Sequence, residues 1–105
     1  MRCRTCQPLP EEVARAADLL ARRWVLAILW AAAEAGAVRF NEFKQALETI
    51  PPRTLAARLS ELEAAGVLER LVLHTRPPRV EYTLTDAGRR LGALVDAMRA
   101  YAAHA

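Results

Sequence analysis

The spacing of apolar residues changes midway along the chain from the period of a helix to that of a strand. The residues that recur at helical spacing are Leu55, Leu59 and Leu62. They define one buried face of a helix, which Gly66 is expected to end, because glycine tolerates the backbone conformation just beyond a helix. Segments 67–74 and 80–84 follow strand patterns on either side of a turn at 75–79 that holds two prolines. A helix followed at once by an antiparallel hairpin is therefore predicted.

The first third of the chain is predicted to be helical. Pro10 suits a first helical position, and the two glutamates after it favour a helix N-terminus, so a helix is expected over about 11–21. Nearly every residue of the segment Trp24–Ala35 is apolar, which indicates a buried central helix that Gly36 ends. The two tryptophans of this segment are interpreted as packing anchors rather than as a ligand site.

Shorter elements complete the prediction. Residues 38–40 are expected to be extended, and Asn41 is expected to cap a helix over 42–47. Pro52 suits the first position of the helix that carries the leucine face, and Thr85 is expected to cap one last helix. The apolar stripe of that last helix consists of Leu91, Leu94, Val95, Met98 and Tyr101.

The order of these elements is that of a winged helix-turn-helix. Two helices and a tight turn over about 41–65 have the spacing of a helix-turn-helix, and the hairpin at about 67–84 makes a wing beside the second helix. Residues 1–10 are interpreted as an irregular arm and residues 11–105 as a single domain, which the length of 105 residues fits. The predicted fold class is mainly α with a small β-hairpin.

The second helix of the motif carries the residues that are expected to read DNA. The residues that point away from the leucine face are Arg53, Ala57 and Ser60. Arg53 lies near the helix N-terminus, where side chains reach base edges, and its guanidinium group suits the acceptors of guanine. Thr54 suits a phosphate or a thymine methyl group, and small Ala57 allows close approach to the groove. Arg58 lies nearer the leucine face, and it either contacts DNA or pairs with Glu42 or another acid.

The tip of the hairpin is a second candidate contact with DNA. Its polar and basic residues are His74, Thr75, Arg76 and Arg79. A basic finger of this kind lies along a phosphate backbone or reaches a minor groove, although an ordinary charged hairpin has the same composition. Pro77 and Pro78 remove N–H donors and so guard the hairpin against pairing with another strand.

Several runs of residues match one family, in the same order along the chain. They are Trp24, Arg39–Phe43, Arg53–Leu55, Arg58–Leu59, Leu62–Glu63, Gly66–Leu68, Arg70, Pro77–Thr85 and Gly88. Over about residues 20–100 the chain resembles the HxlR-type winged-helix regulators, and the Pro77–Thr85 run is the specific part of the match. The resemblance implies a dimeric DNA-binding repressor or activator, often controlled by small reactive molecules.

Three departures from the family pattern stand out. Arg22 and Arg23 precede the tryptophan, where the family usually has glycine and lysine. Pro51 stands where the family often has serine at the start of the recognition helix, so a serine cap is absent there. Many relatives carry a cysteine closer to the tryptophan than Cys6 is in this chain.

Charge and composition agree with this class without proving it. The net charge is only +3, from 15 Lys and Arg against 12 Asp and Glu, which is weak evidence for a nucleic-acid partner. Arginine suits bidentate contacts to phosphate and guanine, although a bias toward Arg and Ala also arises from genome composition. No apolar run is long enough to span a membrane, no signal peptide is recognised, and no catalytic constellation is found, so an enzyme is not expected.

The sequence thus predicts a cytoplasmic transcription regulator, expected to be a repressor, that binds double-stranded DNA. A homodimer formed through the first and last helices would match a pseudo-palindromic operator, and a small-molecule effector is a further expected partner. The alternatives are a winged-helix module that binds protein, and a metal or redox sensor. Binding that weakens strongly with salt separates the first alternative from a DNA-binding protein.

Cys3 and Cys6 are the one pair of reactive residues. Arg2 and Arg4 would favour the thiolate form and lower the thiol pKa. The pair is either a redox switch, half of a zinc site shared by two subunits, or two reduced thiols on the arm. A disulfide between residues this close together closes only a small loop, so a useful signal would need a bond or a metal between subunits. No other cofactor is expected.

Overall fold

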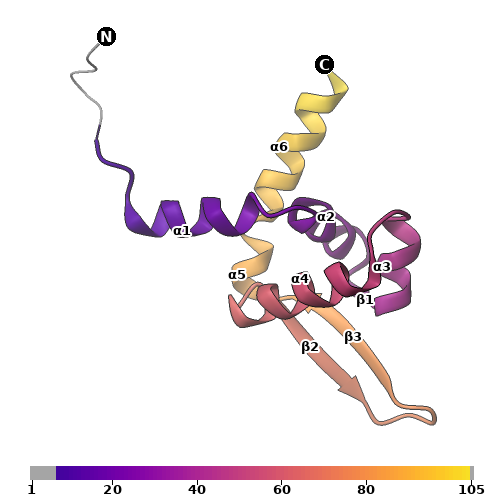
Figure 1. The fold of residues 1–105 in the computed structure, drawn as a ribbon. Coiled ribbons are helices and arrows are strands. Elements are labelled where there is room, and N and C mark those ends of the chain that lie inside the picture. The colour runs from indigo at the N-terminus through magenta and orange to yellow at the C-terminus, as the bar shows by residue number, and fades with distance from the viewer. Residues whose placement is uncertain (1–6, 105) are drawn as a thin grey trace.

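The computed structural model describes residues 7–104, and the predicted redox or metal pair, Cys3 and Cys6, lies outside them. The elements follow the predicted order, and the fold is mainly helical with a small antiparallel sheet (Figure 1). The elements are α1 (Glu11–Leu20), α2 (Val25–Ala35), β1 (Ala37–Val38), α3 (Phe40–Ala46), α4 (Pro52–Ala64), β2 (Leu68–Leu73), β3 (Arg79–Leu84), α5 (Asp86–Arg89) and α6 (Gly92–Ala103).

The core gathers around α2, as the apolar run of that helix predicts. Its largest fully buried side chains are Val25, Ile28, Leu29, Phe43, Leu55, Leu59, Leu62 and Leu68. The leucine face predicted for α4 is confirmed, because all three of its leucines are at most 1% exposed. Burying one such side chain stabilises a fold by about 1.5–3 kcal/mol, so this face fixes the orientation of α4 against the domain.

The two tryptophans differ in their burial. Trp24 has a left-handed backbone with φ 78°, precedes the first turn of α2, and packs half-buried against the core. The guanidinium group of Arg23 stacks 5.0 Å from its ring centroid. Trp30 does not fit the interpretation as an anchor, since it is 39% exposed. It lies about 200° around the helix from buried Ile28, on the face of α2 that the domain does not cover.

The wing is part of a three-stranded sheet with the order β1-β3-β2. Strand β2 pairs with β3 from Leu68 opposite Leu84 to Leu73 opposite Arg79. The extended piece before α3 contributes β1, which pairs Val38 with Tyr82. This third strand was not predicted, and it ties the start of the helix-turn-helix to the root of the wing.

The predicted cap of α3 is wrong by two residues. Arg39, not Asn41, has the extended backbone before the helix, and Asn41 lies inside the first turn. The backbone N–H of Arg39 donates to the Glu42 carboxylate at 2.8 Å, which is the pairing that a glutamate at the third helical position makes in a capping box. Glu42 therefore satisfies the helix end without a polar cap side chain.

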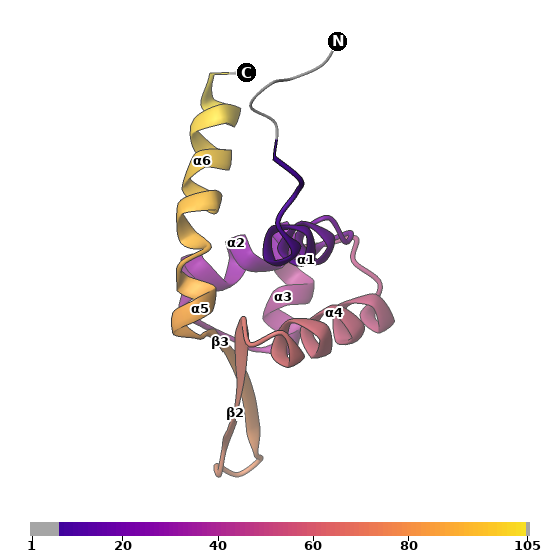
Figure 2. The same cartoon turned by 90° about the vertical axis from the view of Figure 1, so that its left-hand side faces the viewer.

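The single last helix of the prediction is two helices in the structure. Thr85 caps the first of them as expected, because its Oγ1 accepts a hydrogen bond from the Gly88 N–H at 3.0 Å. Leu91 N–H then donates to the Gly88 carbonyl three residues back, so the chain tightens and changes direction between α5 and α6. Gly88 is buried against Val67, which holds α5 on the root of the wing while α6 leaves the domain (Figure 2).

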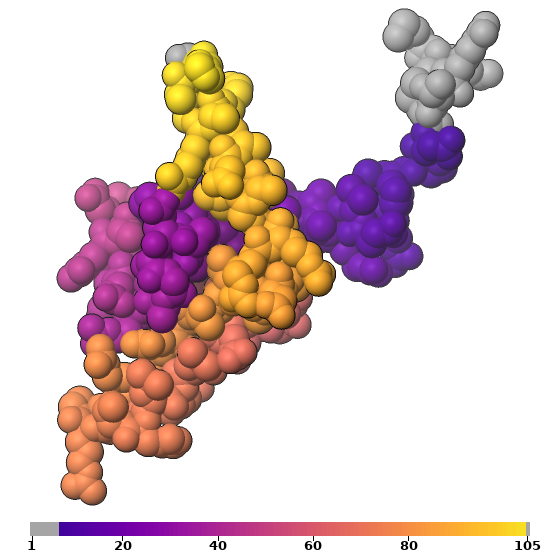
Figure 3. Space-filling view, turned by 180° about the vertical axis from the view of Figure 1, so that it is seen from behind, coloured from indigo at the N-terminus to yellow at the C-terminus, as the bar shows by residue number. Residues whose placement is uncertain are grey.

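Helices α1 and α6 extend from the domain as two arms, on the side away from the wing (Figures 1 and 3). Helix α1 buries none of its residues, and Val95 is the one residue of α6 that is buried. An ion pair between Arg99 and Glu34 ties α6 to α2. Much of the apolar surface of both arms therefore faces outward.

Candidate nucleic-acid interface

The helix-turn-helix consists of α3, the turn after it, and α4. Phe43, Leu47 and Ile50 are buried, so they hold α3 and the turn in the core while α4 crosses the surface. The ring of Phe43 packs edge-on against Tyr82 of the wing, with 6.3 Å between centroids. This contact joins the two parts of the predicted DNA-binding surface through one aromatic pair.

The outward face of α4 consists mainly of small residues and carries one cation, Arg53, near the start of the helix. Arg53, Ala56, Ala57 and Ser60 are exposed, and Thr54 is half-buried. The outward direction predicted for Arg53, Ala57 and Ser60 thus agrees with the structure. Within residues 7–104, the Arg53 side chain forms no hydrogen bond or ion pair with another residue.

The N-terminus of α4 has no side-chain cap. Pro51 is the extended residue before the helix, and Pro52 occupies the first position as predicted. The carbonyl of Pro51 accepts the Leu55 N–H at 2.9 Å, which leaves the N–H groups of Arg53 and Thr54 at the open end. An uncapped helix start directs backbone donors and the positive end of the helix dipole outward.

Arg58 belongs to a cluster of polar contacts that ties α4 to the segment before α2. Its Nε donates to the carbonyl of Arg23 at 3.0 Å, and its guanidinium group pairs with Glu61 at 2.9 Å. Arg22 reaches the same carboxylate at 3.0 Å. Of the two roles considered for Arg58, the structure therefore places it in an ion pair, with Glu61 rather than Glu42 as the acid.

Glu61 was not singled out from the sequence. Its signal was its position three residues after Arg58, the spacing at which helical side chains meet. The Arg22 contact joins residues 39 positions apart and had no local signal. Arg22 belongs to the pair that departs from the family pattern, and the glycine that the family usually has there carries no side chain that could make this bridge.

The wing projects from the end of the molecule along which α4 lies, opposite to the direction of α6 (Figures 1 and 2). Its tip residues are His74, Thr75, Arg76, Pro77, Pro78 and Arg79, all exposed. The Thr75 hydroxyl donates to the Pro77 carbonyl at 2.7 Å and so closes the tip. The structure thus places the predicted wing cations at the exposed tip of the hairpin, which projects from the same end of the molecule as α4 (Figures 1 and 2).

A hydrogen-bonded junction sets the position of the wing relative to α4. Thr85 Oγ1 donates to the Gly66 carbonyl at 2.5 Å, and Thr85 N–H donates to the Val67 carbonyl at 3.0 Å. Gly66, which ends α4, has the left-handed φ of 77° that favours glycine. The end of α4, the start of β2 and the start of α5 therefore meet at this junction.

The predicted dimer residues divide into two groups. Val95 is 3% exposed and belongs to the core of its own subunit, so the expectation that it lies in an interface is wrong. Its position on α6 faces α2, because the helix packs there before it leaves the domain. Leu94 and Tyr101 are 37% and 78% exposed, and Leu91 and Met98 are half-buried.

Metal sites and membrane spans can be judged for residues 7–104. Within this range no group of three or more His, Cys, Asp and Glu side chains is arranged to hold a metal ion. Every helix in the same range is too short or too polar to cross a membrane. The zinc expectation attached to the two cysteines lies outside the described part of the chain.

A helix-turn-helix joined to a wing, with an exposed and partly basic outer face, defines a winged-helix DNA-binding protein. The model for HxlR-like helix-turn-helix proteins matches residues 19–105, and the chain belongs to this family. It is an HxlR-type transcription regulator, as the resemblance implied.

Individual relatives agree with this assignment. The HTH-type transcriptional regulator YvaP of Bacillus subtilis is 41% identical over 77% of this chain and 74% of its own length. The reduced form of the B. subtilis transcriptional regulator YodB is 36% identical, with a TM-score of 0.81, over 90% of this chain and 92% of that one. The redox regulator HypR in its oxidised form is 35% identical, with a TM-score of 0.83, over 90% and 96% of the two chains.

Proposed function

We propose that this protein is a cytoplasmic homodimeric repressor that reads a pseudo-palindromic operator through α4 and the wing. The observation that carries the proposal is the exposed N-terminal turn of α4, where Arg53 and two backbone N–H groups face outward. Side chains at the start of a recognition helix reach base edges, and the backbone donors suit a phosphate. The wing cations lie at the tip of the hairpin that projects from the same end of the molecule as α4.

The residues of this surface divide by the kind of contact they suit. Arg53 is assigned to a guanine edge, and Thr54 to a phosphate or a thymine methyl group. Ala57 allows the helix to approach the groove closely. His74, Thr75, Arg76 and Arg79 are assigned to the backbone, although the Thr75 hydroxyl is already donated within the tip. Arg58 is not assigned to DNA, because Glu61 and the Arg23 carbonyl hold it.

Selection of bound sequences from random duplex DNA tests the proposal directly. A dimer of winged helices should select two inverted half-sites, with centres one helical turn or a multiple of it apart. Recovery of no enriched sequence by the intact protein would contradict sequence-specific reading. Binding to a protein partner that is insensitive to salt would favour the interaction-module alternative instead.

Replacing Arg53 by alanine should reduce affinity for the selected operator by about 1–3 kcal/mol, because a bidentate contact to guanine is lost. Preference should relax at one base position in each half-site. The measurement is equilibrium binding to the operator and to a set of single-base variants. Arg90→Ala, which removes an exposed arginine at the end of α5, outside both α4 and the wing, is the matched control. An equal loss of affinity for all sequences would indicate that Arg53 contacts a phosphate and not a base.

Replacing Arg76 or Arg79 by alanine should weaken binding to every duplex alike. Each contact to phosphate releases about one counterion, so the slope of log affinity against log salt should fall by roughly one per subunit that loses the contact. Titrations at several salt concentrations, on operator and on unrelated DNA, measure this slope. An unchanged slope in both variants would place the wing off the DNA.

We also propose control of DNA binding by an oxidant through Cys3 and Cys6. The support comes from the chain itself, which offers two thiols next to arginines, and from similarity to HypR, which is described as a redox regulator. Counting free thiols and bound zinc, with operator affinity measured before and after oxidation, tests this control. If affinity follows neither thiol state nor metal content, regulation acts elsewhere in the molecule.

A further inference from the structure

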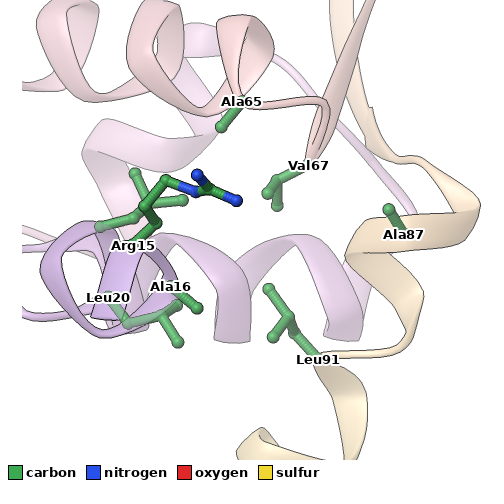
Figure 4. Close-up of a pocket in the computed structure, with 8 residues that line it drawn as sticks. Arg15, Ala16, Leu20, Ala65, Val67, Ala87 and Leu91 are labelled. Atoms are coloured by element: carbon green, nitrogen blue, oxygen red, sulfur yellow. The ribbon is translucent and has the colours of Figure 1, made fainter. Parts of the chain in front are cut away.

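A cavity of about 450 Å³ lies between α1 and the junction that joins α4, the wing and α5 (Figure 4). Leu19 and Leu20 of α1 line one side of it. Val67 and Leu91 line the other side, at the start of β2 and at the turn before α6. Sites for small organic ligands are commonly concave, mostly apolar and between about 300 and 1,000 Å³, so this cavity has the dimensions and lining of a ligand site.

The space in the cavity comes from small side chains. Ala65 at the end of α4 and Ala87 on α5 stand where larger residues would fill the gap, and Ala16 does the same on α1. Figure 4 shows these alanines facing the same hollow from three separate elements. The domain therefore leaves an apolar hollow next to its core instead of closing over it.

One charged residue, Arg15, is among the described residues that line the cavity, and no carboxylate joins it there. Its guanidinium group extends across the cavity toward Val67 (Figure 4). Its partner in the structure is Glu11, one turn earlier on α1, at 3.1 Å. The side chains of both residues are more than 70% exposed, so the pair contributes little and Arg15 can exchange Glu11 for another anion.

We propose that this cavity is the effector site, and that it binds a small molecule with an apolar, ring-sized body and one carboxylate group. The apolar walls remove the body of the molecule from water, and Arg15 pairs with the acid at the mouth. Neutral apolar molecules of the same shape would gain the burial against the apolar walls but would lack the ion pair with Arg15. The acidic group is what gives the site its selectivity.

The position of the cavity links it to DNA binding, and this part of the proposal rests on the function proposed above. The walls belong to α1, one of the two arms, and to the junction where Thr85 and Gly66 fix the wing against α4. A molecule that fits between them holds α1 in one orientation relative to the recognition helix. Since a ligand shifts an equilibrium only by its differential affinity, the effect on operator binding should be of the usual allosteric size, about 5- to 150-fold.

The probe for the binding site is 2-naphthoate, with 2-naphthamide as its neutral isostere, titrated into the full chain by calorimetry without DNA. We expect one naphthoate per subunit and about fivefold weaker binding of the amide, the usual scale of a partly exposed ion pair. Arg15→Gln should abolish the difference between the two probes. Ala65→Phe should fill the cavity and remove binding of both.

Matched controls separate the site from general effects. Arg90→Gln removes an exposed arginine, and Ala33→Phe adds a ring at an exposed helical position, both outside the cavity lining. Both controls should bind the probes as wild type does, with circular dichroism confirming that every variant is folded. Equal wild-type affinity for acid and amide, unchanged binding by folded Ala65→Phe, or no binding to the wild-type dimer would each overturn the site.

Operator affinity with and without naphthoate tests the regulatory part on its own. A change in wild type that Ala65→Phe lacks would support it, and an unchanged affinity at saturating naphthoate would overturn it while leaving the binding site intact. A protein that binds naphthoate but no DNA would contradict the proposed function, not the cavity. The two failures are thus distinguishable.

Discussion

Gly88→Ala is expected to destabilise the domain by about 3 kcal/mol, at the upper end of what overpacking costs. A Cβ built on Gly88 would lie 2.2 Å from the carbonyl oxygen of Val67 and 3.1 Å from the Leu84 side chain. The nearer atom belongs to the backbone of the junction, so no side-chain rotation relieves the contact. The same carbonyl accepts the Thr85 N–H at 3.0 Å, and moving it would strain that hydrogen bond as well.

Thermal and urea unfolding, at a fixed protein concentration, measure this loss. For a domain of about this size, 3 kcal/mol corresponds to a fall in Tm of very roughly 12–24 °C. Gly92→Ala is the matched control, since nothing lies within 4 Å of a Cβ at that position and alanine is the better helix former. Gly92→Ala should leave stability unchanged or slightly higher. Wild-type stability in Gly88→Ala would mean that the junction yields more easily than its hydrogen bonds indicate.

Leu94→Asp is expected to convert a dimer into a folded monomer whose operator affinity is lower by at least about 100-fold. Leu94, Met98 and Tyr101 share one face of α6, and Tyr101 is 78% exposed in the isolated subunit. In the proposed dimer this apolar face would be buried between subunits, where a charge has no partner and its desolvation opposes association. A monomer engages one half-site at a time and loses the effective concentration that links the two, which is typically worth 10²–10⁴.

Sedimentation at micromolar concentration, together with operator titration, measures both consequences. Ala93→Asp is the control, because Ala93 is exposed on α6 about 100° from Leu94 and lies in the first turn, where an acid is favourable. This control should remain dimeric and bind the operator. A wild-type monomer at micromolar concentration, or a dimeric Leu94→Asp, would contradict the assignment of this face. Val95→Asp is unsuitable, since Val95 is in the core and the variant should unfold.

The order of the elements, the inward face of α4 and the hairpin could all be predicted from the sequence alone. These features are local, because the direction of a helical or strand side chain depends on the spacing of its near neighbours. Leu55, Leu59 and Leu62 are therefore buried where their period places them, and Arg53 is exposed for the same reason. The Thr85 cap followed from the type of residue at the start of a helix. The family resemblance agreed with these elements, since its motifs lie on them.

Features that depend on residues far apart in the chain could be seen only in the folded structure. Strand β1 is only two residues long, and it exists because β3 offers it hydrogen bonds. Arg58 is held by Glu61 and by the backbone carbonyl of Arg23. Val95 is buried in the core of its own subunit, because α6 packs against α2 at that point before it leaves the domain. The hollow beside Arg15 lies between segments far apart in the chain. Periodicity reports which side of an element is apolar, but only packing decides whether that side is covered, paired or left open.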